Sequence, residues 1–462
     1  MSRIENKIIQ ELKSKIRGQV ISPTEPDYNK ARTIWNAMIN KKPGVIVRCS
    51  GVADVITSVN IARDSNLLLA VHGAGHNIAG NSVCDGGIMI DLSQMNSVRI
   101  DPKSKKAYVE PGAILGDFDH EAQAFGLATP LGINSTTGVS GLTLGGGFGW
   151  LTRKHGMTID NLISADVITA DGELVHTNEN QKPDLFWAIR GGGGNFGIVT
   201  LFEFQLHKVG PDVLAGLMVF PFKDAKSVLK KYRKFVQKIP NELNVWVILR
   251  QAPPLPFLPK RVHGKEVVIL AILYSGEIKQ GQKLIKPLRR FAKAHGEHTG
   301  AMPYEAWQQG FDPLLTPGAR NYWKSHNFSE LSDGALDAII EYAGKLPSPQ
   351  CEIFIGLLGG KAAKVSPDAM AYGNRDANFI LNVHSRWDKA KDDTKCISWA
   401  RDFFDASAPY ATGGVYINFV TQDETDRIAA AYGKNYNKLV RIKNKYDPNN
   451  LFRVNHNIKP TV

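Results

Sequence analysis

Hydrophobic residues in the first part of the chain alternate between short apolar runs and helical spacing. Residues 44–49 and 67–71 are runs typical of buried strands, and the apolar positions of 52–65 between them recur on one helical face. This order predicts a strand–helix–strand unit. The loop after the second run then lies at the end of a strand, where open sheets commonly bind ligands. We expect residues 1–39, including 33–39, to be a helical lead-in.

The later pattern mixes hairpins with longer strands and helices. An Asp-Gly turn predicts a hairpin over 163–177, and a short helix begins at Pro183. Over 210–410 long strand patterns alternate with helices, including a basic amphipathic helix over 223–238. This alternation of strands and helices predicts a second α+β domain with an antiparallel sheet covered by helices. The pattern alone does not assign residues 411–462 to either domain.

Two glycine-rich stretches stand out, residues 70–81 and 138–149. Because glycine has no side chain, its backbone amide can approach a ligand closely, and two such loops predict a wide anionic cofactor held by N–H groups. The second stretch lies within residues 128–156, which we expect to have little regular structure. A loop of that length in a compact domain is normally functional.

A third glycine cluster imitates a dinucleotide motif. Gly192, Gly194 and Gly197 have the GxGxxG spacing. In a Rossmann unit that motif follows a strand and opens a helix, whereas here a helical pattern precedes it and a strand pattern follows. The chain also lacks GK[ST]. The sequence therefore disfavours an ordinary NAD site and excludes a P-loop.

Composition narrows the class of protein. A length of 462 residues favours two domains. The net charge of +12 comes largely from the amphipathic helix, and without an arginine-rich tract we expect no nucleic-acid partner. No apolar run is long enough to span a membrane and the N-terminal residues are charged throughout, so we expect no membrane association and a cytoplasmic protein. The four cysteines lack CxxC spacing and are expected to be structural thiols, without a metal site.

Polar residues on later segments are candidates for chemistry. Strand alternation places Asn382, His384 and Arg386 on one face. Such a row faces either solvent or an active site, where His384 could take a proton near neutral pH. Strand spacing also gives Tyr416 and Asn418 a shared face, for which a buried core tyrosine is the alternative.

Four motifs in order carry a resemblance to a known family: AVHGAGHNIAG, GVSGLTLGGGFGWLTRKHG, IRGGGGNFGIVT and AYGKNYNKLVRIKNKYDPNNLF. Together they resemble the berberine bridge enzyme-like FAD-linked oxidases of the vanillyl-alcohol oxidase superfamily, over nearly the whole chain. The resemblance implies an α+β fold: a two-subdomain PCMH-type FAD-binding domain over 40–209, a substrate-binding domain over 210–410, and a segment 411–462 that returns to the FAD domain, after the lead-in of 1–39.

The resemblance also implies the cofactor and its attachment. In the family a loop histidine is bonded to the flavin 8α-methyl group, which makes His76 the link. Many members add a cysteine link eleven residues before the position of Gly145; here that position is Asn134, which implies a single covalent link, as in the 6-hydroxy-D-nicotine oxidase-like members. The other FAD contacts implied are Gly73, Ala74, Gly75, Asn77, Thr137, Gly138, Gly141, Gly145, Gly197, Ile198, Val199 and Asn418.

The implied activity is hydride transfer from a small-molecule alcohol or amine to FAD, with O2 as the second partner and H2O2 as product. The family often has an acid or glutamine five residues before a tryptophan; counting from Trp387 gives Asn382, which cannot be a general base. His384 or Tyr416 is then the residue that assists proton loss. Two family tyrosines are replaced, by Ile78 and Phe419. A dehydrogenase with another acceptor and a flavin protein without turnover remain alternatives, and no oligomeric state is predicted.

Overall fold

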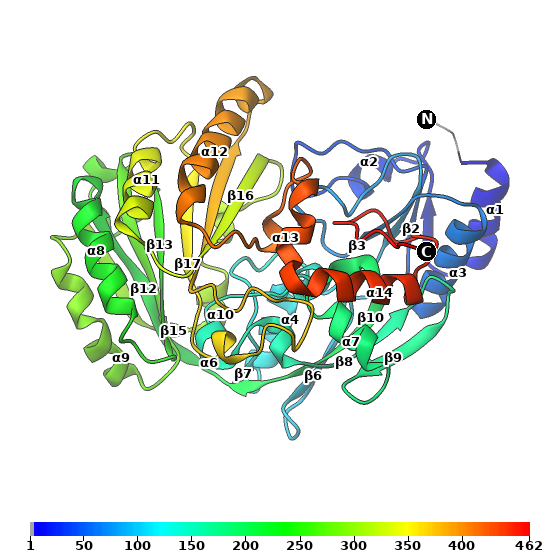
Figure 1. The fold of residues 1–462 in the computed structure, drawn as a ribbon, viewed down its shortest axis with the longest axis horizontal. Coiled ribbons are helices and arrows are strands. Elements are labelled where there is room, and N and C mark those ends of the chain that lie inside the picture. Colours follow the sequence, from blue (N-terminus) through cyan, green and yellow to red (C-terminus); the bar gives the residue numbers. More distant parts are fainter. Residues whose placement is uncertain (1–3) are drawn as a thin grey trace.

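Two domains lie side by side in the computed structural model, which describes residues 4–462 apart from the side chain at position 425 (Figure 1). The first domain holds two larger sheets and the two-stranded sheet β11-β7. The second is built on one large antiparallel sheet, and the C-terminal helices return to the first domain (Figure 1). This is the mixed α+β architecture that the sequence predicts.

The first sheet contains the predicted strand–helix–strand unit. Its order is β1-β2-β4-β3, with β2, β3 and β4 parallel. The elements are α1 Asn6–Lys15, β1 Gln19–Ile21, α2 Tyr28–Ala31, β2 Val45–Arg48, α3 Val52–Asp64, β3 Leu69–His72 and β4 Ile88–Asp91. Residues 19–21 of the lead-in are a strand antiparallel to β2, so this segment is not wholly helical.

Residues 33–39 are also not a helix, because their amides bond to other segments. The Trp35 N–H donates to the Gly75 carbonyl at 3.1 Å and the Ala37 N–H donates to the Ala319 carbonyl at 3.0 Å. The segment therefore ties the loop after β3 to the second domain.

The second sheet is antiparallel, with the order β5-β6-β10-β8-β9. Its elements and their neighbours are β5 Val98–Asp101, β6 Lys106–Val109, α4 Leu115–Gln123, β7 Leu127–Ala128, β8 Leu162–Ile168, β9 Leu174–Asn178, α7 Pro183–Ile189, β10 Ile198–Gln205 and β11 His207–Lys208. The hairpin β8–β9 and the helix that begins at Pro183 confirm the predictions for this region. The GxGxxG residues form a turn between α7 and β10, as the disfavoured Rossmann context implied.

The glycine-rich stretch 128–156 has more regular structure than expected. It contains α5 Val139–Leu144 and α6 Thr152–His155. The apolar residues between the glycines form α5, and the turn that follows needs positive φ at Gly146 (125°) and Gly147 (73°), which only glycine adopts at little cost. The expectation of an irregular loop was wrong because it weighed the glycines alone.

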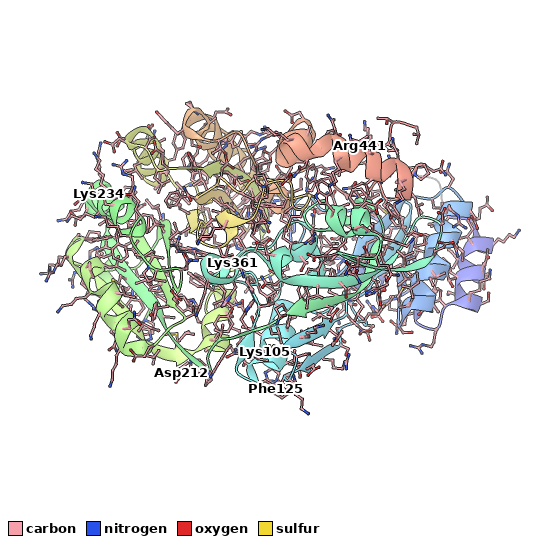
Figure 2. The ribbon with its side chains drawn as sticks, turned by 60° about the horizontal axis from the view of Figure 1, so that its bottom comes forward. Lys105, Phe125, Asp212, Lys234, Lys361 and Arg441 are labelled. Atoms are coloured by element: carbon pink, nitrogen blue, oxygen red, sulfur yellow. The ribbon has the colours of Figure 1, made fainter. Side chains whose placement is uncertain are left out.

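The second domain is a seven-stranded sheet with the order β15-β12-β14-β13-β17-β18-β16. Its strands are β12 Asp212–Pro221, β13 Leu243–Gln251, β14 Glu266–Tyr274, β15 Gly296–Pro303, β16 Arg320–Phe328, β17 Glu352–Leu357 and β18 Phe379–Trp387; its helices are α8 Ala225–Val236, α9 Ile278–Ile285, α10 Tyr304–Gln308, α11 Asp333–Ala343 and α12 Asp393–Ser407. Helices α8, α9, α11 and α12 cover the side of the sheet away from the first domain (Figure 1). Lys234 of the basic helix α8 is exposed and points outward (Figure 2).

The C-terminal segment crosses between the domains and ends against the first. Helices α13 Ile428–Tyr432 and α14 Tyr436–Tyr446 follow the crossing, and α14 packs against α7. Residues 417–419 form a 3-10 turn, closed by the Phe419 N–H bonded to the Tyr416 carbonyl, and not the strand that the spacing suggested. Within the described residues, all four cysteines are buried thiols, and no helix is long and apolar enough to span a membrane.

Candidate active site

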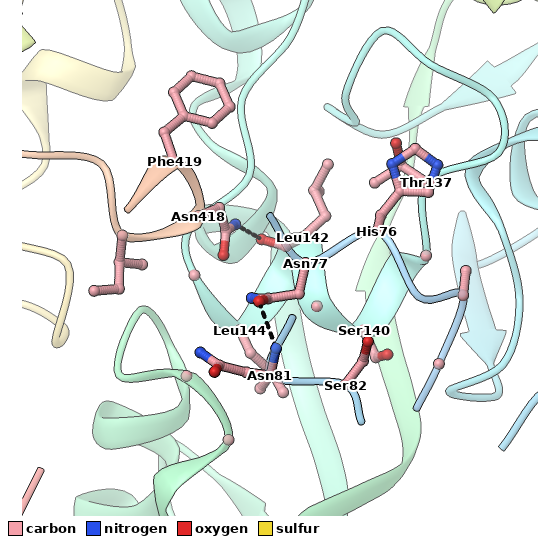
Figure 3. A pocket seen from close by; sticks show the side chains of 18 of the residues that line it. His76, Asn77, Asn81, Ser82, Thr137, Ser140, Leu142, Leu144, Asn418 and Phe419 are labelled. Atoms are coloured by element: carbon pink, nitrogen blue, oxygen red, sulfur yellow. Dashed lines mark hydrogen bonds between the residues drawn. The ribbon is translucent and has the colours of Figure 1, made fainter. Parts of the chain in front are cut away.

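A cavity of about 350 Å³ lies between the two domains and reaches into the first. Side chains from the loop after β3, from α5 and from the C-terminal segment reach it (Figure 3), and residues of the second-domain sheet line it as well. Every residue that the sequence suggested for cofactor or substrate lines it: Gly73, Ala74, Gly75, His76, Asn77, Thr137, Gly138, Gly141, Gly145, Gly197, Ile198, Val199, Asn382, His384, Tyr416 and Asn418.

The two glycine-rich stretches form one wall of the cavity. Gly75 has φ of 71°, and a side chain there would lie 2.7 Å from His72 Cε1. A side chain at Gly138 would lie 3.0 Å from the Cβ atom of Ala74, so the two loops approach closely only because one residue is glycine. Asn77 Oδ1 accepts the Asn81 N–H at 2.9 Å and closes the loop after β3 (Figure 3).

Buried polar atoms without partners gather around this cavity. On the first-domain and C-terminal side they are Ser82 Oγ, Tyr432 Oη, Asn455 Oδ1 and His456 Nε2; on the sheet side they are Trp246 Nε1, Trp323 Nε1 and Asn382 Oδ1. A buried polar atom without a partner costs roughly 1–3 kcal/mol. Donors and acceptors at both ends fit a long ligand with polar groups along its length, such as FAD.

His76 lies where the two domains meet. Its Nε2 atom is 2.9 Å from Thr136 Oγ1, and its ring stacks on Trp35 with a centroid distance of 4.9 Å and an interplanar angle of 23°. Burial, and then the positive charge of Arg386, lower the pKa of His76 to about 4. The imidazole is therefore neutral at pH 7. His72 is partly buried, with its ring close to Gly75, and does not line the cavity.

Four strands of the second domain bring one polar row to the opposite wall. Arg250, Glu352, His384 and Trp323 are directly opposed across β13, β17, β18 and β16. Arg250 Nη1 is 2.6 Å from Glu352 Oε2, and His384 Nδ1 is 3.1 Å from Glu352 Oε1. Burial alone would raise the pKa of Glu352, but Arg250 and His384 outweigh it and lower that pKa to about 2. Glu352 is therefore an ionised carboxylate.

The alternation predicted for β18 is correct, and its alternative of a solvent-facing row is wrong. Asn382, His384 and Arg386 are 4%, 5% and 2% exposed. Burial, as the leading cause, lowers the pKa of His384, although Glu352 raises it. Asn321 Oδ1 lies 3.4 Å from His384 Nε2, so each ring nitrogen has an oxygen beside it.

Tyr416 reaches the cavity from the C-terminal segment. Its oxygen accepts the Gly147 N–H and the Asn418 amide, each at 3.0 Å, and Asn418 also donates to the Leu142 carbonyl (Figure 3). Burial raises the pKa of Tyr416 to about 12, against the effect of those two donors. The phenol is therefore neutral, and with its oxygen occupied as an acceptor its own hydrogen is available to a ligand.

Aromatic side chains form a continuous belt around the second-domain end of the cavity. Phe148 contacts Trp246 and Tyr416, with centroid distances of 5.9 and 5.1 Å. Phe419 contacts Tyr416 at 5.0 Å and Trp323 at 5.4 Å. Edge-to-face packing of this kind leaves apolar surface toward a flat ligand.

Sequence reasoning missed several residues of the site. Glu352 is a single acid at the start of an apolar strand, and only the strand register pairs it with His384. Trp35 lies in a segment whose hydrogen bonds are made to residues far away in the sequence. Asn455 and His456 follow the last helix. The only feature of the sequence that could have indicated them is that they lie shortly after the fourth family motif.

A buried ion pair holds that tail in place. Lys443 on α14 and Asp447, the residue directly after that helix, are wholly buried, and the Nζ–Oδ2 distance is 2.6 Å. The Lys443 ammonium also donates to the Asn195 and Phe452 carbonyls, while Asp447 accepts the N–H groups of Leu451 and Phe452. The pair thereby joins the glycine turn before β10 to the tail that lines the cavity.

Asp447→Asn is expected to lower the free energy of unfolding by about 3–5 kcal/mol, because it leaves a buried ammonium without its partner. Urea unfolding followed by tryptophan fluorescence measures this. The matched control is Glu341→Gln, which removes an exposed pair with Lys345 and should cost less than about 1 kcal/mol. Equal effects of the two changes would contradict the role of the buried pair.

The fold and the cavity define an FAD-linked oxidoreductase, and comparison with known proteins agrees. Residues 43–178 match the FAD binding domain family, and residues 415–459 match the berberine and berberine-like family. The chain is 33% identical to an FAD-linked oxidoreductase of Dictyostelium discoideum, over 98% of this chain and 97% of that protein. It therefore belongs to the berberine bridge enzyme-like family of FAD-linked oxidoreductases.

Two further similarities lie within the same family. The chain is 29% identical to (R)-6-hydroxynicotine oxidase of Paenarthrobacter nicotinovorans, over 96% of this chain and 97% of that protein. Its fold is similar to the crystal structure of 6-hydroxy-D-nicotine oxidase from Arthrobacter nicotinovorans, with a TM-score of 0.86, 27% identity, and coverage of 96% of this chain and 98% of that one.

Proposed function

We propose that the chain is an oxidase that moves a hydride from a planar aromatic alcohol or cyclic amine to FAD and passes the electrons to O2, forming H2O2. One observation carries the proposal: the Glu352–His384 pair lines the same cavity as the glycine-rich wall. Bound FAD supplies the hydride acceptor. The residues of the chain bind and orient the substrate and accept its proton.

We infer that FAD is held along the glycine-rich wall and attached through His76 alone. The cofactor contacts are those that line this wall, and backbone amides of α5 and of the turn before β10 offset the charge of the pyrophosphate. Asn134 occupies the position of the second link of some family members, and its amide cannot form a thioether. A single tether follows from that residue type.

His384 is the proton acceptor in this proposal. With Glu352 accepting from Nδ1, the neutral ring keeps its lone pair on Nε2. When His384 takes the substrate's O–H or N–H proton, the charged ring has Glu352 at one nitrogen and Asn321 at the other. The ionised Glu352 stabilises that positive charge, so the pair favours loss of the proton as the hydride leaves.

The other polar groups orient the substrate. Tyr416 offers its hydrogen to a heteroatom of the substrate, and Asn382 offers an unpaired Oδ1 acceptor. The aromatic belt favours a flat ring over a sugar chain, because a sugar would leave many hydroxyl groups without partners against it.

A substrate panel read as H2O2 tests the function. Aromatic alcohols and cyclic amines should give H2O2 in equal amount to the O2 consumed, with little gain from an added dye acceptor. A reaction that needs the dye and consumes no O2 would make the protein a dehydrogenase. An oligosaccharide turned over faster than any flat compound would contradict the substrate class.

A further inference from the structure

His76 ends a hydrogen-bond relay that begins at Asn134. Asn134 Oδ1 accepts the Thr136 backbone N–H at 3.0 Å and the Thr136 hydroxyl at 2.5 Å. A threonine hydroxyl has one hydrogen, so toward His76 the Thr136 oxygen can only accept. His76 Nε2, 2.9 Å away, must therefore carry the ring hydrogen. The relay selects one tautomer and leaves the lone pair of His76 on Nδ1.

Trp35 fixes the orientation of the same ring. It stacks on His76 and is itself held by both domains, since its N–H donates to the Gly75 carbonyl and its Nε1–H donates to the Leu315 carbonyl at 2.8 Å. The guanidinium of Arg386 also lies over the Trp35 ring, 5.2 Å from the centroid. The three side chains form one stack at the domain boundary.

Arg386 brings to this stack a positive charge that has no salt-bridge partner, although Asp388 and Glu352 act on it from farther away. It is 2% exposed, and its hydrogen bonds go to neutral oxygens of Thr316, Gln350 and Asn321. Among residues 4–462 no carboxylate lies within ion-pair distance of it. A second positive charge nearby is therefore unfavourable, which keeps the imidazole of His76 neutral.

Other titratable groups lie on the elements packed around His76. They are His72 at the end of β3, His384 on β18, Glu352 on β17, and Asp312, which accepts the Ser135 N–H. None of these is a cause of the lowered pKa of His76, for which burial and Arg386 account.

We propose that Asn134, Thr136 and Arg386 are positioning residues that prepare His76 for covalent attachment to FAD through Nδ1. This rests on the proposed function, in which His76 is the link. In the net step a bond forms between Nδ1 and the carbon of the flavin 8-methyl group. That carbon loses one hydrogen and the His76 ring loses its own, and the ring proton passes to solvent. O2 accepts the two electrons and two protons and leaves as H2O2.

Attachment can be followed without turnover. The full chain is produced under riboflavin limitation and mixed with FAD in air at pH 8, and flavin that stays with the acid-precipitated polypeptide is measured against time. Thr136→Val and Asn134→Leu should slow attachment by about 10- to 100-fold, the effect seen when a metal-bound histidine loses its orienting hydrogen bond. Thr136→Ser and Asn134→Asp, which keep the hydroxyl and the acceptor, should attach flavin near the wild-type rate.

The pH dependence of the attachment rate tests the role of the positive charge of Arg386. Attachment in wild type should weaken only as pH falls toward about 4, the lowered pKa of His76. Arg386→Met removes one cause of that lowering, so the pKa of His76 rises and the loss of rate moves to higher pH. Arg386→Lys keeps the charge and should keep the wild-type profile. A merely structural role of Arg386 would leave both profiles at the same pH.

The outcomes separate this inference from the function on which it rests. If wild type releases its flavin in acid, the assignment of His76 fails. If wild type retains it, equal rates in Thr136→Val and wild type overturn the relay, and a superimposable Arg386→Met profile overturns the role of the charge. Should a larger change unfold the chain, slow attachment in Thr136→Ser or Asn134→Asp still overturns the relay.

Discussion

His76→Ala should give a protein whose acid precipitate is colourless, while the wild-type precipitate stays yellow. Acid unfolds the chain, so only a covalent bond can keep the flavin with it. Alanine has no nucleophilic nitrogen, and with Asn134 at the alternative position no second bond replaces the first. The measurement is the visible absorbance of the washed precipitate, redissolved in denaturant.

The matched control is His456→Asn, which removes another histidine from the same cavity. His456 lies on the tail, among the residues of the first domain, so its loss should weaken non-covalent binding and leave the yellow precipitate. A yellow precipitate from His76→Ala would assign the link to another residue. A colourless one from wild type would remove the covalent link from the proposed function.

Glu352→Gln should lower the rate of flavin reduction by about 10²- to 10⁴-fold, the range typical of lost acid–base assistance. The change removes the carboxylate that stabilises a charged His384, and it leaves Arg250 without its ion pair. The measurement is the rate at which a substrate found in the H2O2 panel bleaches the oxidised flavin in the absence of O2.

The pH profile gives this prediction a second readout. His384 accepts a proton only when neutral, so the rate falls as pH drops through its pKa. Glu352 raises that pKa, and the other influences lower it. Without Glu352 the pKa of His384 is lower still, and the acid limb should move to lower pH while the plateau falls. The control is Glu341→Gln, at an exposed position, which should change neither the acid limb nor the plateau rate. If the acid limb stays at the same pH in Glu352→Gln, then Glu352 does not act through His384.

Much of the fold could be predicted from local sequence patterns. The strand–helix–strand unit, the hairpin and the alternation of β18 follow from side-chain period and turn residues that act over a few positions. The 3-10 turn at Tyr416 and the extended path through Trp35 could not be predicted in this way, because their backbone bonds and side-chain contacts depend on partners such as Gly75 and Gly147, far away in the sequence.

The candidate site also has one part that local sequence patterns predict and one part that depends on contacts between distant residues. The cofactor wall was recognisable because glycines and His76 are consecutive in the chain. On the opposite wall His384 was recognisable from strand alternation, but Glu352 was not, because the two residues meet only through the register of β17 on β18, and a shift of one residue would have turned Glu352 to the other face. The relay from Asn134 to His76 joins two loops 58 or more residues apart that no local rule connects.

The place of His456 in the cavity wall sets the order of events during biosynthesis. A nascent chain that has emerged only as far as α12 already holds both domains, yet its cofactor chamber is open on the side that the tail later covers. We therefore expect stable binding of FAD to follow translation of residue 456. A stop codon placed after Phe452, which keeps the Lys443–Asp447 pair, should yield a chain that folds its sheets and accumulates without yellow colour.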